Sequence, residues 1–150
     1  MTYYLAILLC LIGLWISIYF TGVSFHWFSP DVKWIPQVCQ LKEKTCQLVL
    51  ETPRAKLFGI PNSVFGIGLY LFLLFLFFYV GAPFMAPFAK GAINRAPTLW
   101  WIGFIAIGLA TARSIYLAYS LIFVTRVPCP LCFTSHAINL FLLVHLWLSR

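Results

Sequence analysis

Four long stretches of the chain are apolar almost without interruption. They lie within residues 1–30, 57–89, 96–125 and 127–149, and Arg113 is the one charged residue inside them. A helix that crosses the bilayer needs about 20 such residues. The pattern therefore predicts four membrane-spanning helices, at Tyr3–Val23, Ser63–Pro83, Thr98–Thr125 and Pro130–Leu148.

Composition supports the membrane interpretation. Hydrophobic residues make up 63% of the chain and charged residues 9%, and the mean hydropathy is +0.96. Soluble globular domains are far more polar. We expect one all-α integral membrane domain over residues 1–150, a four-helix bundle with a long loop between its first two helices. The first apolar run lacks the basic start and cleavage site of a secretory signal, so we expect it to be retained.

Charge gives conflicting information about topology. The net charge of +7 lies mostly in loops beside membrane ends, which favours contact with lipid headgroups rather than nucleic acid. The two loops 24–62 and 126–129 share a side with four of the five cysteines and hold six Lys and Arg, against three on the other side. The positive-inside rule then puts these cysteines in the cytoplasm. Paired thiols instead favour an oxidising compartment. We follow the cysteines and expect a bacterial inner membrane with both pairs on the periplasmic side.

The cysteines form two pairs and one single residue. Cys39 and Cys46 lie in the first loop, and Cys129 and Cys132 form a C-x-x-C at the start of the fourth helix. A helix N-terminus favours an anion and hence a nucleophilic thiolate. Since thiolates pass electrons by attacking disulfides, a loop pair facing a helix pair predicts a relay. A structural zinc site and inert bridges are the alternatives, and Cys10 is expected to be a small buried apolar residue.

Polar residues form a line on the fourth helix. Positions three or four apart share a helix face, so Cys129, Cys132, His136 and Asn139 fall on one stripe. His136 is a candidate donor to a ligand oxygen, or a histidine satisfied by a neighbouring helix. Arg113 is a functional candidate because it is charged within a span, although it can also snorkel to headgroups.

The second helix carries a similar line. Asn62, Gly66 and Tyr70 follow at four-residue spacing, and we expect them to face a ligand. Asn62 can instead cap the helix, and Gly66 and Gly68 can serve only close helix packing.

Three segments resemble the vitamin K epoxide reductase family. They are "NSVFG" at Asn62–Gly66, "SIYLAYSLIFV" at Ser114–Val124 and "CPLCFTSHAIN" at Cys129–Asn139. The resemblance covers most of Pro61–His145. The family includes bacterial and archaeal homologues that generate disulfides.

The resemblance implies a four-helix bundle around a quinone. Cys132 would then contact the quinone, with Cys129 as its resolving partner. Cys46 would exchange with Cys129, and Cys39 would complete a loop disulfide that oxidises a thioredoxin-like protein.

The resemblance also implies quinone contacts. Asn62 matches an asparagine that hydrogen-bonds a quinone oxygen in the family, and His136 stands where vertebrate members have a tyrosine in that role. This departure argues against epoxide reduction. Arg113 has no family counterpart.

The leading hypothesis is a membrane oxidoreductase without a metal. It would pass electrons from a reduced thioredoxin-like protein to ubiquinone, menaquinone or vitamin K, and so promote disulfide formation. One alternative is a vitamin K epoxide or quinone reductase of an endoplasmic reticulum membrane. Another is a non-enzymatic membrane subunit or small transporter with structural cysteines.

Overall fold

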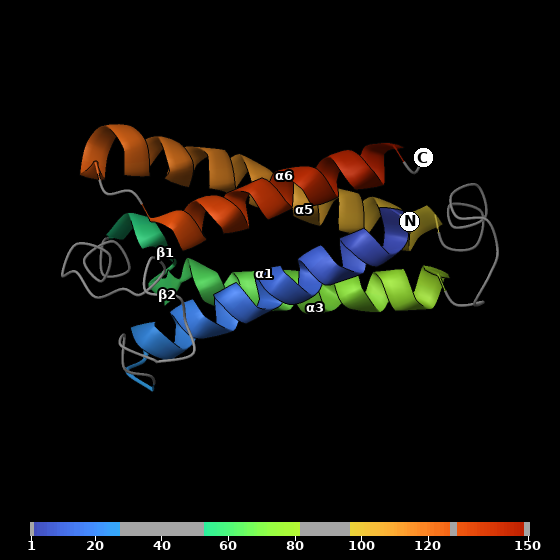
Figure 1. Cartoon of the computed structure of the whole chain (residues 1–150), viewed down its shortest axis with the longest axis horizontal. Coiled ribbons are helices and arrows are strands. Elements are labelled where there is room, and N and C mark those ends of the chain that lie inside the picture. The colour runs from blue at the N-terminus through green and yellow to red at the C-terminus, as the bar shows by residue number, and fades with distance from the viewer. Residues whose placement is uncertain (1, 28–52, 82–96, 127–128, 149–150) are drawn as a thin grey trace.

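Four long helices dominate the computed structural model, which describes residues 2–27, 53–81, 97–126 and 129–148 (Figure 1). They run alongside one another, parallel to the long axis of the molecule. The helices are α1 (Thr2–Ser24), α3 (Asn62–Gly81), α5 (Pro97–Tyr119) and α6 (Pro130–Leu148).

The apolar runs predicted these helices closely. Every helix start lies within one residue of its predicted position, and α6 has the predicted bounds. Three helices in the described residues are long and apolar enough to cross a membrane: Tyr4–Ser24, Thr98–Val124 and Pro130–Leu148. The apolar stretch of α3, Asn62–Phe78, is shorter, so the fourth crossing stays a prediction.

The helices pack as a ring. α1 packs against α3 and α6, and α5 packs against α6 and α3. Their inward faces bury large apolar side chains such as Tyr19, Leu73, Ile107 and Leu142, while many others remain exposed on the outside. An outer surface this apolar suits lipid rather than water. Cys10 is fully buried in the core, as predicted.

A short β-hairpin precedes α3. After the 3₁₀ turn η2 (Pro53–Ala55), β1 (Lys56–Leu57) pairs antiparallel with β2 (Ile60–Pro61). Phe58 and Gly59 connect the strands with φ of 53° and 82°. Positive φ at both central residues is the pattern of a type I′ turn. The sequence predicted only a loop here, because two-residue strands are too short to show alternation.

The last turns before the C-x-x-C are also not regular α-helix. α5 passes directly into the π-helix η3 (Ser120–Thr125), where the sequence predicted one uniform helix to Thr125. Arg126 ends it in the left-handed conformation, with φ of 53°, and donates its N–H to the Leu121 carbonyl. η3, the hairpin and the start of α6 all lie at the same end of the bundle (Figure 1).

Candidate functional site

A cavity of about 340 Å³ lies within the bundle. All four long helices and the segment from Arg54 to Pro61 contribute to its wall, which is mostly apolar with a few polar side chains. This combination is typical of a small-molecule site, where a few polar groups orient a largely apolar ligand. Cys132 lines this cavity, so a thiol of the predicted redox pair faces the space where a ligand would bind.

The C-x-x-C pair begins α6. Cys129 immediately precedes the helix and is 3% exposed, whereas Cys132 in the first turn is half-buried. The backbone N–H of Cys132 donates to Sγ of Cys129, at 3.4 Å. Cys129 therefore acts as the N-cap, and its sulfur receives the hydrogen bond that stabilises negative charge at a helix start.

The predicted stripe on α6 is partly reproduced. Cys132, His136 and Asn139 line the cavity, but Cys129 does not. The reason is that Cys129 precedes the helix and does not follow its periodicity. Nδ1 of His136 is buried and has no hydrogen-bond partner among the described residues, so no neighbouring helix satisfies this nitrogen.

A chain of hydrogen bonds joins three helices below the cysteines. The Tyr70 hydroxyl on α3 donates to Oδ1 of Asn139 on α6, at 2.7 Å. Nδ2 of Asn139 donates to Oγ of Ser114 on α5, at 2.9 Å. All three side chains are buried, so this chain fixes one wall of the cavity.

The predicted residues of α3 all line the cavity, with different surroundings. Asn62 makes no side-chain hydrogen bond to the described residues, whereas the Tyr70 hydroxyl is engaged by Asn139. A Cβ on Gly66 would lie 2.6 Å from Oγ of Ser17, so Gly66 also allows α1 to approach closely. A Cβ on Gly68 would meet nothing within 4 Å, so the close-packing interpretation is wrong for Gly68.

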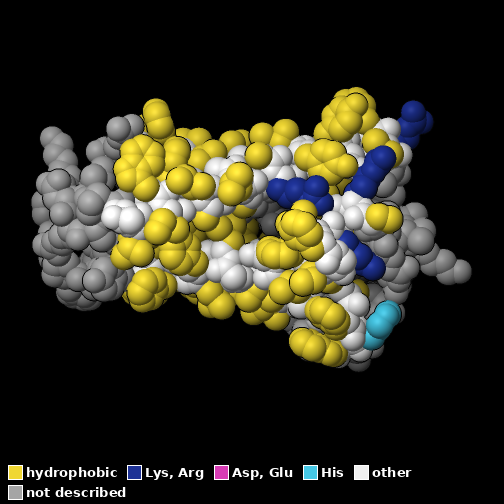
Figure 2. Space-filling model, turned by 180° about the vertical axis from the view of Figure 1, so that it is seen from behind, with side chains coloured by type: hydrophobic (Ala, Val, Ile, Leu, Met, Phe, Trp, Pro, Cys, Tyr) yellow, Lys and Arg dark blue, Asp and Glu magenta, His cyan; other side chains and the backbone are white. Residues whose placement is uncertain are grey.

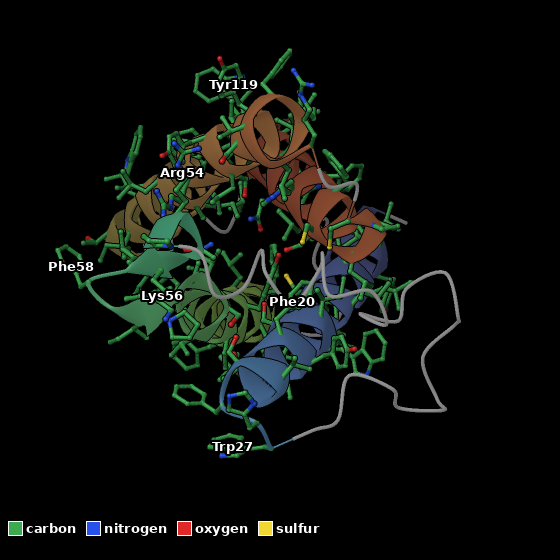
Figure 3. The ribbon with its side chains drawn as sticks, turned by 90° about the vertical axis from the view of Figure 1, so that its left-hand side faces the viewer. Phe20, Trp27, Arg54, Lys56, Phe58 and Tyr119 are labelled. Carbon is green, nitrogen blue, oxygen red and sulfur yellow. The ribbon has the colours of Figure 1, made fainter. Side chains whose placement is uncertain are left out.

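Arg113 connects α5 to the segment before the hairpin. Its Nη2 donates to the carbonyl oxygens of Arg54, at 2.7 Å, and Lys56, at 3.4 Å. Nη1 of Arg54 donates in return to Oγ of Ser120, at 3.3 Å. Figure 3 shows Arg54 beside α5, while Phe58 at the hairpin tip points away from the bundle. Arg113 and Arg54 both line the cavity, so Arg113 is a site residue as well as a link between segments.

The basic side chains gather at the cysteine end. In the part of the chain that is described, Lys and Arg side chains occur at that end, and hydrophobic side chains cover most of the visible remainder (Figure 2).

Arg54 was missed as a cavity residue because its contact with α5 joins residues distant in sequence. Ser135 was also missed, although its spacing of three from Cys132 and four from Asn139 placed it on the predicted face.

Two predictions concern residues that the structure does not describe. Cys39 and Cys46 lie outside the described residues, so their pairing and their approach to Cys129 stay predictions.

Within the described ranges, no group of three His, Cys, Asp or Glu side chains could hold a metal ion.

The chain was also compared with known protein families and with curated proteins. The profile of the vitamin K epoxide reductase family matches residues 4–147, nearly the whole chain. The comparison with curated proteins gave no match. The matched region contains the cavity, the C-x-x-C and almost all of the four long helices. The chain therefore belongs to the vitamin K epoxide reductase family and is an integral membrane oxidoreductase.

Proposed function

We propose that this protein oxidises a reduced thioredoxin-like protein and passes the electrons to a membrane quinone, so that it promotes disulfide formation. Electrons would travel from the partner to Cys39 and Cys46, then to Cys129 and Cys132, and finally to the quinone. Members of the family use a quinone or vitamin K as electron partner and work with thiol redox proteins. The direction of transfer and the kind of partner are our proposal.

One observation supports the proposal above the others: Cys132 and His136 line the same cavity, and Nδ1 of His136 has no hydrogen-bond partner among the described residues. The two residues are four apart, so they lie one above the other on α6. The cavity is mostly apolar, and it is lined by the Cys132 thiol and, one helical turn further along α6, by the polar ring of His136. This arrangement suits a flat apolar ring that carries oxygens. The residues present therefore fit a quinone.

The cysteines would divide the chemistry. The hydrogen bond from the Cys132 N–H to the sulfur of Cys129 favours a thiolate there, which suits exchange with a loop disulfide. Cys132 faces the cavity, which suits transfer to the quinone. Each exchange step moves two electrons, breaks one S–S bond and forms another. When the quinone is finally reduced, the Cys129–Cys132 disulfide forms again.

We place the reaction on the periplasmic face of a bacterial inner membrane. The support is that paired thiols cycle through disulfides in an oxidising compartment, and that the hairpin and the C-x-x-C lie at the same end of the bundle. The count of basic residues argues for the opposite orientation, and labelling of cysteines in intact cells decides between the two.

Reduction of vitamin K epoxide is the competing activity within the family. His136 occupies the position where vertebrate members carry a tyrosine, which favours quinone over epoxide as the substrate. The third hypothesis, a subunit with structural cysteines, has the family's oxidoreductase activity against it.

The test is a direct assay of the purified chain in lipid nanodiscs. It is mixed with a reduced thioredoxin-like protein and ubiquinone or menaquinone, and quinone absorbance is followed. Vitamin K epoxide is assayed in parallel. We expect turnover with a quinone, none with the epoxide, and none in Cys132→Ser. Absence of turnover in the wild type, or full turnover in Cys132→Ser, contradicts the proposal.

A further inference from the structure

Arg113 lines the cavity, and within its guanidinium one nitrogen is restrained and another has no partner among the described residues. Nη2 is held by the carbonyl oxygens of Arg54 and Lys56, and the Tyr116 ring centroid lies 5.1 Å from Cζ. These contacts restrain the guanidinium plane. Nε is buried and has no hydrogen-bond partner among the described residues. Because arginine stays protonated, Nε is always a donor, and leaving it unmatched in a buried place is costly.

The unpartnered Nε of Arg113 has a counterpart on the neighbouring helix. Four buried side-chain polar atoms lack a partner in the described part of the chain, and two of them, Nε of Arg113 and Nδ1 of His136, belong to residues that line the cavity. The hydrogen bond from Asn139 to Ser114 ties their two helices together close by, because Ser114 follows Arg113 and Asn139 lies three residues beyond His136. Unsatisfied buried polar atoms call for an explanation, and a ligand with two oxygens supplies one.

The described part of the cavity wall is also positively charged. Arg54 and Arg113 line it, and the residues that the structure describes include no Asp or Glu. A charge at a protein surface or cavity attracts an opposite charge more strongly than the same pair would attract in bulk water. The cavity therefore favours a ligand oxygen that carries negative charge over a neutral one.

We infer that Arg113 is a catalytic residue whose Nε–H donates to a quinone oxygen and stabilises the negative charge that this oxygen gains on reduction. The inference rests on the proposed function. A cation that is already restrained in the wall of the site can stabilise developing negative charge with little reorganisation.

The electron balance shows where the charge arises. One thiolate and one thiol, from Cys129 and Cys132, are oxidised together and form an S–S bond. The quinone accepts their two electrons and the single proton of the thiol, which yields the hydroquinone anion. Water then supplies the second proton. Arg113 would hold the anionic oxygen until that proton arrives.

Two matched probes test the inference by equilibrium binding. Hydroxynaphthoquinone is an anion at neutral pH, and methoxynaphthoquinone has nearly the same shape but is neutral. Both are titrated into the full chain in nanodiscs by calorimetry, with wild type, Arg113→Gln and Arg54→Gln. The Arg54 variant is the matched control, since it removes one charge from the same wall but keeps the carbonyl that Arg113 contacts.

We expect the wild type to prefer the anionic probe and Arg113→Gln to weaken its binding by about 10- to 100-fold, the range for losing a hydrogen bond to a charged donor. Binding of the neutral probe should change less, and Arg54→Gln should lose less of the preference than Arg113→Gln. An unchanged preference in Arg113→Gln, or an equal loss in Arg54→Gln, overturns the inference.

Failure of the proposed function has a different signature. If the wild type binds neither probe nor menadione, the cavity is not a quinone site and the inference falls with it. If menadione binds and is reduced but the preference does not depend on Arg113, only the inference is wrong. Should Arg113→Gln not fold, Arg113→Lys replaces it: it keeps the charge but lacks the planar donor set, so part of the preference should be lost, and an unchanged preference overturns the inference.

Discussion

The hydroxyl of Tyr70 on α3 donates a hydrogen bond to Oδ1 of Asn139 on α6, with 2.7 Å between the oxygens. The backbone of α3 packs mainly against α1 and α5, so this contact reaches across the bundle. Because Asn139 also donates to Ser114 on α5, one buried amide joins three helices. These three hydrogen-bonded side chains line the cavity, so they link the stability of the bundle to the shape of the site.

Removing the Tyr70 hydroxyl tests this link. Tyr70→Phe leaves Oδ1 of Asn139 without that donor, and we expect a loss of about 1–3 kcal/mol of stability. Ser114→Ala should act similarly through Nδ2 of Asn139. Thermal unfolding midpoints in one detergent compare the variants. Since both bonds share Asn139, the double variant should lose less than the sum of the two. An unchanged midpoint in Tyr70→Phe contradicts the role of this chain.

Two glycines provide a matched test of helix packing. A Cβ on Gly13 would overlap the ring of Tyr70, which is 1% exposed and cannot move away, whereas a Cβ on Gly68 would meet nothing within 4 Å. We expect Gly13→Ala to lower stability by about 1–3 kcal/mol, the usual cost of overpacking a core. Gly68→Ala should be neutral or slightly stabilising, since alanine favours helix. Equal unfolding midpoints for the two variants would show that α1 does not pack on Tyr70 as described.

Much of the fold could be predicted because each helix depends on a local pattern. A continuous apolar run shows where a bilayer helix lies, and the C-x-x-C after Pro128 shows where α6 begins. Three of the cavity-lining residues of α6 followed from helical spacing alone. His136 and Asn139 were predicted on one face with Cys132, and all three line the cavity.

The remaining features depend on contacts that no local pattern reveals. Arg113 meets the carbonyl of Arg54, which is 59 residues away, so the sequence left its role open between a headgroup and a site. The turn of the hairpin places Phe58 in the left-handed conformation, which bulky residues rarely adopt. The overlap between Gly13 and Tyr70 likewise joins two helices whose relative rotation the sequence does not state.

Two substitutions of Cys129 distinguish its role as the cap of α6 from its proposed role in disulfide exchange. Its Sγ caps α6 by accepting the N–H of Cys132, and it is proposed to exchange disulfides. Cys129→Ser keeps an oxygen acceptor at the cap, so stability should stay close to that of the wild type. Cys129→Ala should lose about 1 kcal/mol, a typical value for a lost N-cap. Quinone reduction should vanish in both. Turnover in Cys129→Ser would contradict the redox role, and equal midpoints for the two variants would contradict the cap.

His136→Leu should move stability and activity in opposite directions. Its buried Nδ1 has no partner in the described residues, so an apolar replacement removes a cost and the unfolding midpoint should stay level or rise. The KM for quinone should rise about tenfold, the equivalent of one lost hydrogen bond. His136→Tyr restores a donor and should recover part of the affinity. An unchanged KM in His136→Leu would remove His136 from the quinone site.

The loop pair is tested by changing the reductant. If Cys39 and Cys46 only carry electrons from a protein partner to Cys129, then Cys46→Ala should abolish quinone reduction by a reduced thioredoxin-like protein. A small dithiol such as dithiothreitol can reduce the helix pair directly, so turnover with it should persist in Cys46→Ala and be lost in Cys132→Ser. Both reductants are assayed on the same nanodisc preparations by quinone absorbance. Equal loss with both reductants in Cys46→Ala would mean that the loop cysteines maintain the fold. Full activity with the protein reductant would mean that the partner reaches the helix pair without them, because thiol exchange needs only one accessible disulfide sulfur.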